Sequence, residues 1–480
     1  MSARTGTTPR NGAFAAVRDE SPKRLLERSL IEAADDRVMT RDQAQAVIER
    51  VIKMSKAEGV LVNIGGGYSA NIRFADNRIS TAGGVSQANV SIQSSFGPKH
   101  AFASTNDLSD AGLQQAVQTS EALARLAPDD PEAMPLLGPQ TYDDVKNFFD
   151  STANLGPDGR AAAAKIAIDR CKAAGNLKAA GFLVTGIGAQ AVGDNKGLFA
   201  YQSGTSSNYT LTVRTTDGTG SGWAGADHPD WSKVDVAGVA QRAADKARLS
   251  RNPVAVEPGL YTVVMEPQAV GDLVQLLAGA LDARSADEGR SPFSKQGGGT
   301  KIGQKIADER VTLFSDPTDP QLLSNAFDGE GLPSHRQVWI ENGVLKKLTY
   351  SRFWAKKMNT TPDAGTNAVK LAGGSASLDD LIAATPRGIL VTRLWYLRPV
   401  DPRTVLYTGL TRDGTFLIEN GKISHAIKNM RFNDSPLFLL NNLDALGRAE
   451  RVAGTEAGGD VVMPAIKAHD FTFTSLSDAV

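Results

Sequence analysis

Histidine, which supplies many zinc ligands and catalytic bases in proteins, is sparse and scattered in this chain. No two histidines lie within five positions of each other, so no pair sits one turn apart on a helix, where two metal ligands would converge. A zinc site assembled from distant residues is left as the alternative. The five histidines are His100, His228, His335, His425 and His469.

The other motifs with chemical potential also have structural interpretations. Cys171 lies in an alanine-rich helical pattern that places Ala167, Ile168 and Ala174 on its face, so we interpret it as a small core residue rather than a nucleophile. Gly65–Gly67 is followed by a strand pattern and by no Lys-Ser/Thr pair. It therefore does not predict a phosphate-binding loop, which needs a helix N-terminus at that point.

Arginines in the C-terminal half have the chemistry to bind carboxylate groups or a peptide. Most of them stand near acidic residues in the sequence, and we interpret these as structural ion pairs at strand ends. They are Arg336, Arg352, Arg393, Arg398, Arg403 and Arg412. The candidates kept for peptide binding are His335, Arg336, Arg393 and Arg412.

A helix is predicted just past the midpoint of the chain, over residues 267–286. It begins at Pro267, and an apolar stripe at helical spacing predicts that one face is buried. Leu276 and Ala280 widen that stripe. The stripe itself consists of Val270, Leu273, Val274, Leu277 and Leu281. We interpret this segment as a structural helix packed against the C-terminal domain.

The order of elements predicts an α+β fold with a repeat in the first half. A helix, a series of strands and a second helix are expected over residues 40–127, and the same order is expected over 158–247. Two related units are the interpretation, with chance similarity of two layered units as the alternative. We expect a disordered tail at 1–35, an α+β domain at 36–135, a second α+β unit at 136–255 and a β-rich domain at 256–480.

Turn signals predict that the C-terminal domain is mostly antiparallel β-sheet. Asn342-Gly343 and Asn420-Gly421 each lie between alternating apolar runs, which is the strongest short-range sign of a hairpin. Asp413-Gly414 predicts a third hairpin.

Composition excludes several classes of protein. Lys and Arg total 52 against 53 for Asp and Glu, so the net charge gives no reason to expect nucleic acid or an anionic membrane as a partner. No stretch approaches the roughly 20 apolar residues of a membrane-spanning helix. A single cysteine fits a reducing compartment, and no signal peptide pattern opens the chain. We expect a soluble cytoplasmic protein.

Several stretches between residues 256 and 440 resemble the TldD/PmbA family of bacterial and archaeal peptidase-related proteins. The family's usual pattern is an acidic Asp-x-Glu-Gly-x-Pro segment, an arginine and a Leu-Ile-Glu-Asn-Gly hairpin. The matching segments here are 287–290, 316–318, 327–336, 338–345, 400–403, 408–414 and 416–423.

The resemblance implies where a zinc site would lie and that it is missing. TldD-type members carry His-Glu-x-x-x-His on a helix and a late cysteine as third protein ligand. The corresponding positions here are Gln275, Leu276 and Ala280, with Glu456 at the cysteine position. The resemblance therefore places this chain with the PmbA-type members, also called TldE, which lack the zinc motif and pair with a TldD-type partner.

Three functions are consistent with these observations. The first is a non-zinc-binding PmbA/TldE-like subunit of a metallopeptidase complex that cleaves or matures unfolded peptides, with zinc in the partner. The second is a peptidase with an unrecognised site. The third is a stand-alone homodimer that binds peptides. Metal analysis separates the first two, and association with a zinc-bearing relative separates the first from the third.

Overall fold

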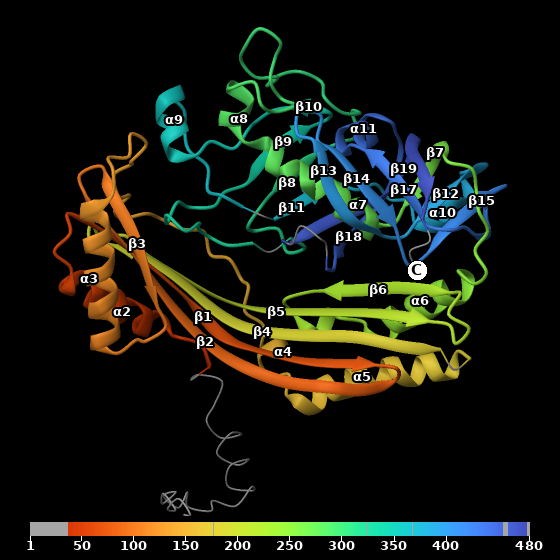
Figure 1. Ribbon diagram of the computed structural model, residues 1–480, viewed down its shortest axis with the longest axis horizontal. Helices are drawn as coiled ribbons and strands as arrows, with labels where there is room; N and C mark the ends of the chain where they lie inside the picture. The colour runs from red at the N-terminus through yellow and green to blue at the C-terminus, as the bar shows by residue number, and fades with distance from the viewer. Residues whose placement is uncertain (1–36, 176, 323, 367, 455–458, 478–480) are drawn as a thin grey trace, which may run out of the picture. The chain divides into compact units, whose positions relative to one another are not determined.

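A computed structural model describes residues 37–480 except 176, 323, 367, 455–458 and 478–480. The predicted disordered tail at 1–35 and the residue Glu456 therefore lie outside the described residues. Within the described part, the chain forms two β-sheets with their covering helices (Figure 1).

The first half of the chain forms one antiparallel sheet. Among the described residues it has six strands in the order β3-β2-β1-β4-β5-β6, and β1 pairs with β4 at the centre. Figure 1 shows the long strands β1, β2, β4 and β5 running side by side. The strands are β1 Gly59–Ala75, β2 Arg78–Phe96, β3 Lys99–Thr105, β4 Lys178–Asp194, β5 Phe199–Arg214 and β6 Ser221–Asp227.

The predicted order of helix, strands and helix occurs twice in the described residues. Each copy has a helix, two long strands, a short strand and a closing helix, and the strand order makes the sheet symmetric about β1 and β4. The helices that open and close the two copies are α2 Arg41–Met54, α3 Asp110–Leu126, α5 Pro157–Ala173 and α6 Val236–Leu249, with the short α4 Asp150–Ala153 and η2 Trp231–Lys233 between them.

The first strand, β1, is long and continues through Gly65–Gly67 without a break. A side chain at Gly66 would approach the backbone oxygen of Gln87 to 2.5 Å. Glycine is therefore required where β1 and its neighbour pass closely, and it does not mark a loop here.

Alternate side chains of β1 point to the same face of the sheet, and the helices cover that face. Val60, Val62 and Ile64 are buried against α2 and α3. Further along the same strand, Ile72 and Phe74 are buried in a cluster with α5 and α6. Cys171 on α5 belongs to this second cluster, and burial raises the pKa of its thiol to about 11. The interpretation of Cys171 as a core residue is thus confirmed.

The second half of the chain forms a larger, mostly antiparallel sheet, as predicted. Its central path runs β10-β9-β8-β11-β19-β7-β12-β15-β16, and only β11–β19 and β12–β7 pair in parallel among the described residues. The strands are β7 Gly259–Met265, β8 Leu313–Ser315, β9 Gln337–Glu341, β10 Val344–Leu345, β11 Val369–Leu371, β12 Arg387–Val391, β13 Leu394–Asp401, β14 Leu406–Thr411, β15 Thr415–Glu419, β16 Lys422–Ala426, β17 Met430–Asp434, β18 Leu443–Val452 and β19 Val461–Leu476. The helices are α7 Pro267–Val274, η3 Gln275–Leu281, α8 Ala283–Asp287, α9 Arg352–Met358, α10 Leu378–Ala383 and α11 Pro436–Asn441.

Two of the three predicted hairpins are confirmed. Asn342-Gly343 joins β9 to β10, and Asn420-Gly421 joins β15 to β16, with positive φ at all four residues, as this turn requires. The third prediction is wrong. Asp413-Gly414 connects β14 to β15, but these strands pair with other neighbours, β14 with β13 and β17, and β15 with β12 and β16. The turn therefore redirects the chain within the sheet.

The helix predicted at 267–286 is broken into three pieces. The α-helix α7 ends at Val274, a 3₁₀ segment follows to Leu281, and Asp282 adopts an extended conformation. The break is stabilised because the Asp282 side chain accepts a hydrogen bond from the Ser285 N–H at 2.7 Å, capping α8. The backbone also pairs there, since the Thr349 N–H donates to the Leu281 carbonyl.

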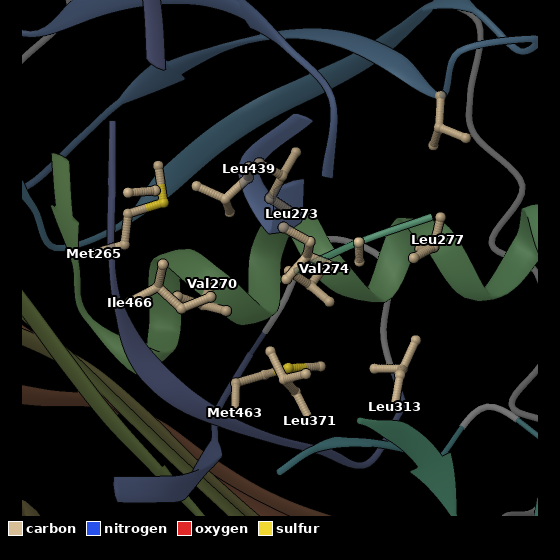
Figure 2. Close-up of a cluster of buried hydrophobic side chains, with 14 of the residues drawn as sticks. Met265, Val270, Leu273, Val274, Leu277, Leu313, Leu371, Leu439, Met463 and Ile466 are labelled. Carbon is tan, nitrogen blue, oxygen red and sulfur yellow. The ribbon is translucent and has the colours of Figure 1, made fainter. Parts of the chain in front are cut away.

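The apolar stripe of this segment is nevertheless buried as predicted. Val270, Leu273, Val274, Leu277 and Leu281 are each at most 1% exposed. Figure 2 shows side chains of α7 and η3 projecting among those of the surrounding strands and of α11. The neighbours labelled there are Met265, Leu313, Leu371, Leu439, Met463 and Ile466.

Asp434, at the end of β17, gives the folded chain a dependence on pH. Its side chain is 3% exposed, and burial raises its pKa from the ordinary 3.8 to about 6, although N–H groups of Thr472 and Ser435 donate to it. At a pH between these two pKa values, the Asp434 carboxyl is protonated in the folded chain and has lost its proton in the unfolded chain. Stability therefore falls as pH rises from about 4 to 6, by roughly 3 kcal/mol from this group.

Urea unfolding of the wild type and of Asp434→Asn at several pH values measures this contribution. We expect the wild type to lose stability relative to the variant between about pH 4 and 6. Parallel curves for the two proteins would contradict the assignment.

Among the described residues, none of the helices combines the length and apolar character that crossing a bilayer demands.

Candidate functional site

The positions that the resemblance assigns to the zinc motif carry side chains whose chemistry does not suit a zinc ion. Gln275 is buried at the start of η3, and Leu276 and Ala280 are partly buried against the core of the C-terminal domain. An amide, an isobutyl and a methyl group cannot replace two imidazoles and a carboxylate as ligands and base. That these positions correspond to the family's ligands stays a prediction, and Glu456 lies outside the described residues.

Asp272, three residues before Gln275, shows what this part of α7 does instead. Its carboxylate is 1% exposed and accepts hydrogen bonds from the Leu394 N–H and the Gln268 side chain, both at 3.1 Å. Since Leu394 is the first residue of β13, Asp272 fixes that strand to α7. The segment therefore has a structural role here.

The structure also indicates how the histidines are surrounded. In the described part of the chain, no three His, Cys, Asp or Glu side chains gather closely enough to hold a metal ion. His335 lies on the surface, with its imidazole 3.5 Å from the Asp143 carboxylate. His469 lies 2.9 Å from Asp444, and His100 lies 3.8 Å from Asp130.

Two of the arginine candidates come together around one buried carboxylate. Asp413, 4% exposed, lies 3.1 Å from the Arg393 guanidinium and 3.7 Å from that of Arg412. It also accepts a hydrogen bond from the Ser221 hydroxyl at 2.7 Å, which links β6 to the C-terminal domain. These two arginines therefore have structural ion pairs, as predicted for most of the group.

Arg336, the third arginine candidate, is more exposed than Arg393 and Arg412. It lies 3.5 Å from Asp316 and stacks over the Phe314 ring at 4.8 Å, with about half of its side chain exposed. A role of His335, Arg336, Arg393 or Arg412 in binding peptide stays a prediction.

The acidic segment around Asp328 folds into a tight turn beside the six-stranded sheet. Asp328 accepts hydrogen bonds from the N–H groups of Glu330, Leu332 and Gly365. Burial raises its pKa, and these three donors oppose that rise. The preceding Phe327 packs with Leu61 and Val192 of the sheet. The segment thus anchors the C-terminal domain to β1 and β4.

A polar groove crosses the face of the six-stranded sheet opposite the helices. A cavity of about 880 Å³ adjoins a second one of about 420 Å³, and Gln190 and Asn325 line both. Gly67, Gly188 and Gly204 lie directly opposite one another on three adjacent strands and form part of its floor. A side chain at Gly65 would meet open space, which shows how hollow the floor is.

The groove is closed on one side by Arg451 of β18. Its guanidinium lies 2.7 Å from Asp227 of β6 and 2.6 Å from Asp460, and it donates to the carbonyl oxygens of Gln321 and Leu322. Burial would lower the pKa of Arg451, but the carboxylates of Asp460 and Asp227 outweigh that effect and raise it. The arginine therefore stays charged and ties both sheets together.

The groove offers binding chemistry. Its walls present amide side chains, hydroxyl groups and backbone atoms, together with an arginine already neutralised by two carboxylates. Sequence reasoning missed this site, because Arg451 and Asp227 are far apart in the chain. The available signal was the glycines within strands, at Gly65–Gly67 and at Gly186 and Gly188, where a ligand or another backbone can approach closely.

Comparison with known families decides which group the chain belongs to. Residues 62–124, 153–251 and 258–475 match models of the PmbA/TldA metallopeptidase domain 1, central domain and C-terminal domain. This chain belongs to the PmbA/TldD family. The three matches follow the repeat units and the β-rich half described above, and they confirm the resemblance seen in the sequence.

Relatives with assigned names are distant. "Metalloprotease PmbA" of Escherichia coli O157:H7 is 22% identical over 475 residues, 93% of this chain and 97% of that protein. A "Metalloprotease" of Methanothermobacter thermautotrophicus is 27% identical over 233 residues, 45% of this chain, and the match spans only about half (49%) of its length. A "Metalloprotease TldD homolog" of Buchnera aphidicola is 29% identical, and the match spans 45% of its length.

Solved structures confirm the fold. TldE from Thermococcus kodakarensis superimposes with a TM-score of 0.81 at 21% identity, covering 89% of this chain and all of that one. The chain is thus a metallopeptidase-like protein of the PmbA/TldE fold.

Proposed function

We propose that this chain is a non-zinc-binding, PmbA/TldE-like subunit of a TldD/E-type metallopeptidase complex. In this complex a TldD-type partner supplies the zinc and hydrolyses the peptide bond. This chain completes the chamber and helps to hold an unfolded peptide in an extended form. The products are cleaved or matured peptides. The location that fits its single, buried cysteine is the reducing cytoplasm.

The observation that carries the proposal is the combination of a retained scaffold with unsuitable ligand positions. All three family domains are matched, yet Gln275, Leu276 and Ala280 provide no zinc ligand. A chain that keeps the architecture without the metal chemistry is best explained as a partner of one that has both. The polar groove supports the proposal that this chain helps to hold an unfolded peptide, because amide and hydroxyl groups in the groove can hydrogen-bond to a peptide backbone.

The experiment is to mix the chain with a family member from the same genome that carries His-Glu-x-x-x-His. Mass in solution and cleavage of an unfolded peptide are then measured for each protein alone and for the mixture. We expect a heterodimer whose peptidase activity exceeds that of the partner alone. If the two do not associate and the partner is fully active alone, the subunit proposal fails and the homodimeric binding function takes its place.

Metal content gives a separate prediction. The purified chain is expected to hold far less than one zinc ion per chain and to show no chelator-sensitive peptidase activity. Elemental analysis checks this, with the zinc-bearing relative purified in parallel as the control. A tightly held zinc at one per chain would instead support an unrecognised peptidase site.

A further inference from the structure

We propose that the free edge of β2, residues 78–89, binds the backbone of an extended peptide by adding it as a further strand of the sheet. This inference rests on the proposed peptide-handling function and names the element that would carry it. The ligand is an unfolded, mostly neutral peptide, recognised by its backbone hydrogen-bonding groups rather than by particular side chains.

The edge exists because β3 is much shorter than β2. β1 pairs with β2 from Arg78 to Ser95, whereas β3 pairs only with residues 90–96. Within the described part of the chain, β1 is the one strand that borders residues 78–89. Alternate N–H and C=O groups of this stretch therefore face outward and can pair with another extended chain.

In the second repeat unit, the corresponding strand edge pairs with other parts of the chain. β6 pairs with only the last part of β5, residues 208–214, so residues 199–207 correspond to the free part of β2. There the Thr205 N–H donates to the carbonyl of Asn147 at 2.9 Å, and the Ser207 N–H donates to that of His228 at 3.1 Å. Asn147 lies in a segment without regular secondary structure that connects the two units. One edge of this symmetric sheet thus already pairs with irregular chain.

The β2 edge also lacks the features that protect other sheet edges from pairing. Residues 80–89 include no charged residue and no proline, and ten consecutive residues from Arg78 to Gln87 are exposed. Gly83 and Gly84 reduce side-chain hindrance, which suits peptides of varied sequence. A peptide added here would border the groove, because Val85 and Gln87 line its larger cavity.

Hydrogen exchange of the full chain with a defined probe tests the proposal. The probe is a ten-residue peptide of alternating valine and serine, and the control is the same peptide with alternate backbone amides N-methylated. We expect the first probe to slow exchange at about half of the amides of residues 79–89. N-methylation is expected to weaken binding at least tenfold, since several backbone hydrogen bonds are lost.

Two adjacent proline variants provide the matched control. Neighbouring residues on an edge strand point their N–H groups in opposite directions, so Ser86→Pro and Gln87→Pro must differ. One should abolish probe binding with little change in Tm, and the other should disturb pairing with β1 and lower the Tm.

Equal binding of the two probes, or protection confined to other residues, would overturn the proposal. Protection of residues 79–89 without probe, rising with protein concentration alongside a dimeric mass, would overturn it in favour of pairing between two copies. None of these results depends on the zinc-bearing relative, so they leave the subunit proposal to its own test.

Discussion

Replacing Arg451 with methionine is expected to lower the free energy of unfolding by about 3 kcal/mol. The Arg451 side chain is 10% exposed, and its guanidinium contacts the carboxylates of Asp227 and Asp460 and three backbone carbonyl oxygens. Methionine fills much of the volume but leaves two carboxylates close together without their counter-charge. Since Asp227 belongs to β6 and Arg451 to β18, the loss should loosen the connection between the two sheets.

Urea unfolding measures this effect, and the same strand offers a control. Arg448 on β18 is exposed, so Arg448→Met should change stability by less than about 0.5 kcal/mol. Arg451→Lys keeps the charge but loses the forked geometry, and an intermediate loss is expected. Equal effects of Arg448→Met and Arg451→Met would refute the central role given to Arg451.

Leu273→Ala is expected to cost a similar amount, about 3 kcal/mol within a range of roughly 2–5 kcal/mol. Leu273 is fully buried near the C-terminal end of α7, where it packs among apolar side chains of the surrounding strands and of α11 (Figure 2). The expected readout is a lower midpoint of urea unfolding with an unchanged slope.

Leu276→Ala is the matched comparison for this substitution. Leu276 lies on the same segment but is only partly buried, so its truncation should cost clearly less than that of Leu273. If Leu276→Ala proved the more damaging change, the assignment of the buried face would be wrong.

The elements that the sequence predicted well are those whose periodicity is local. Val270, Leu273 and Val274 recur at helical spacing, and they are buried as expected. Asn342-Gly343 forms its hairpin because both residues tolerate positive φ. Asp413-Gly414 has the same local chemistry but no hairpin, because strand pairing there is decided by distant neighbours. The residues of a turn therefore predict where the chain reverses, but they do not predict whether the strands on either side pair with each other.

The groove illustrates the same limit for a site. The glycines within β1 and β4 predicted no groove, because a glycine within a strand indicates a close approach without identifying the group that approaches. Only the register shows that Gly67, Gly188 and Gly204 face one another. Likewise, Arg451 and Asp227 are separated by 224 positions, so no spacing in the sequence indicates that they form an ion pair.

The symmetry of the six-stranded sheet has a consequence for how the first half of the chain folds. Each repeat unit alone would be a three-stranded half-sheet whose β1 or β4 edge lacks its long antiparallel partner. A fragment limited to residues 37–135 is therefore expected to pair along that edge with a second copy of itself and form a symmetric dimer. The present chain has the arrangement of such a dimer within one polypeptide. Among the described residues, one outer edge of the sheet is bordered by irregular chain, whereas residues 78–89 of the other pair with β1 alone.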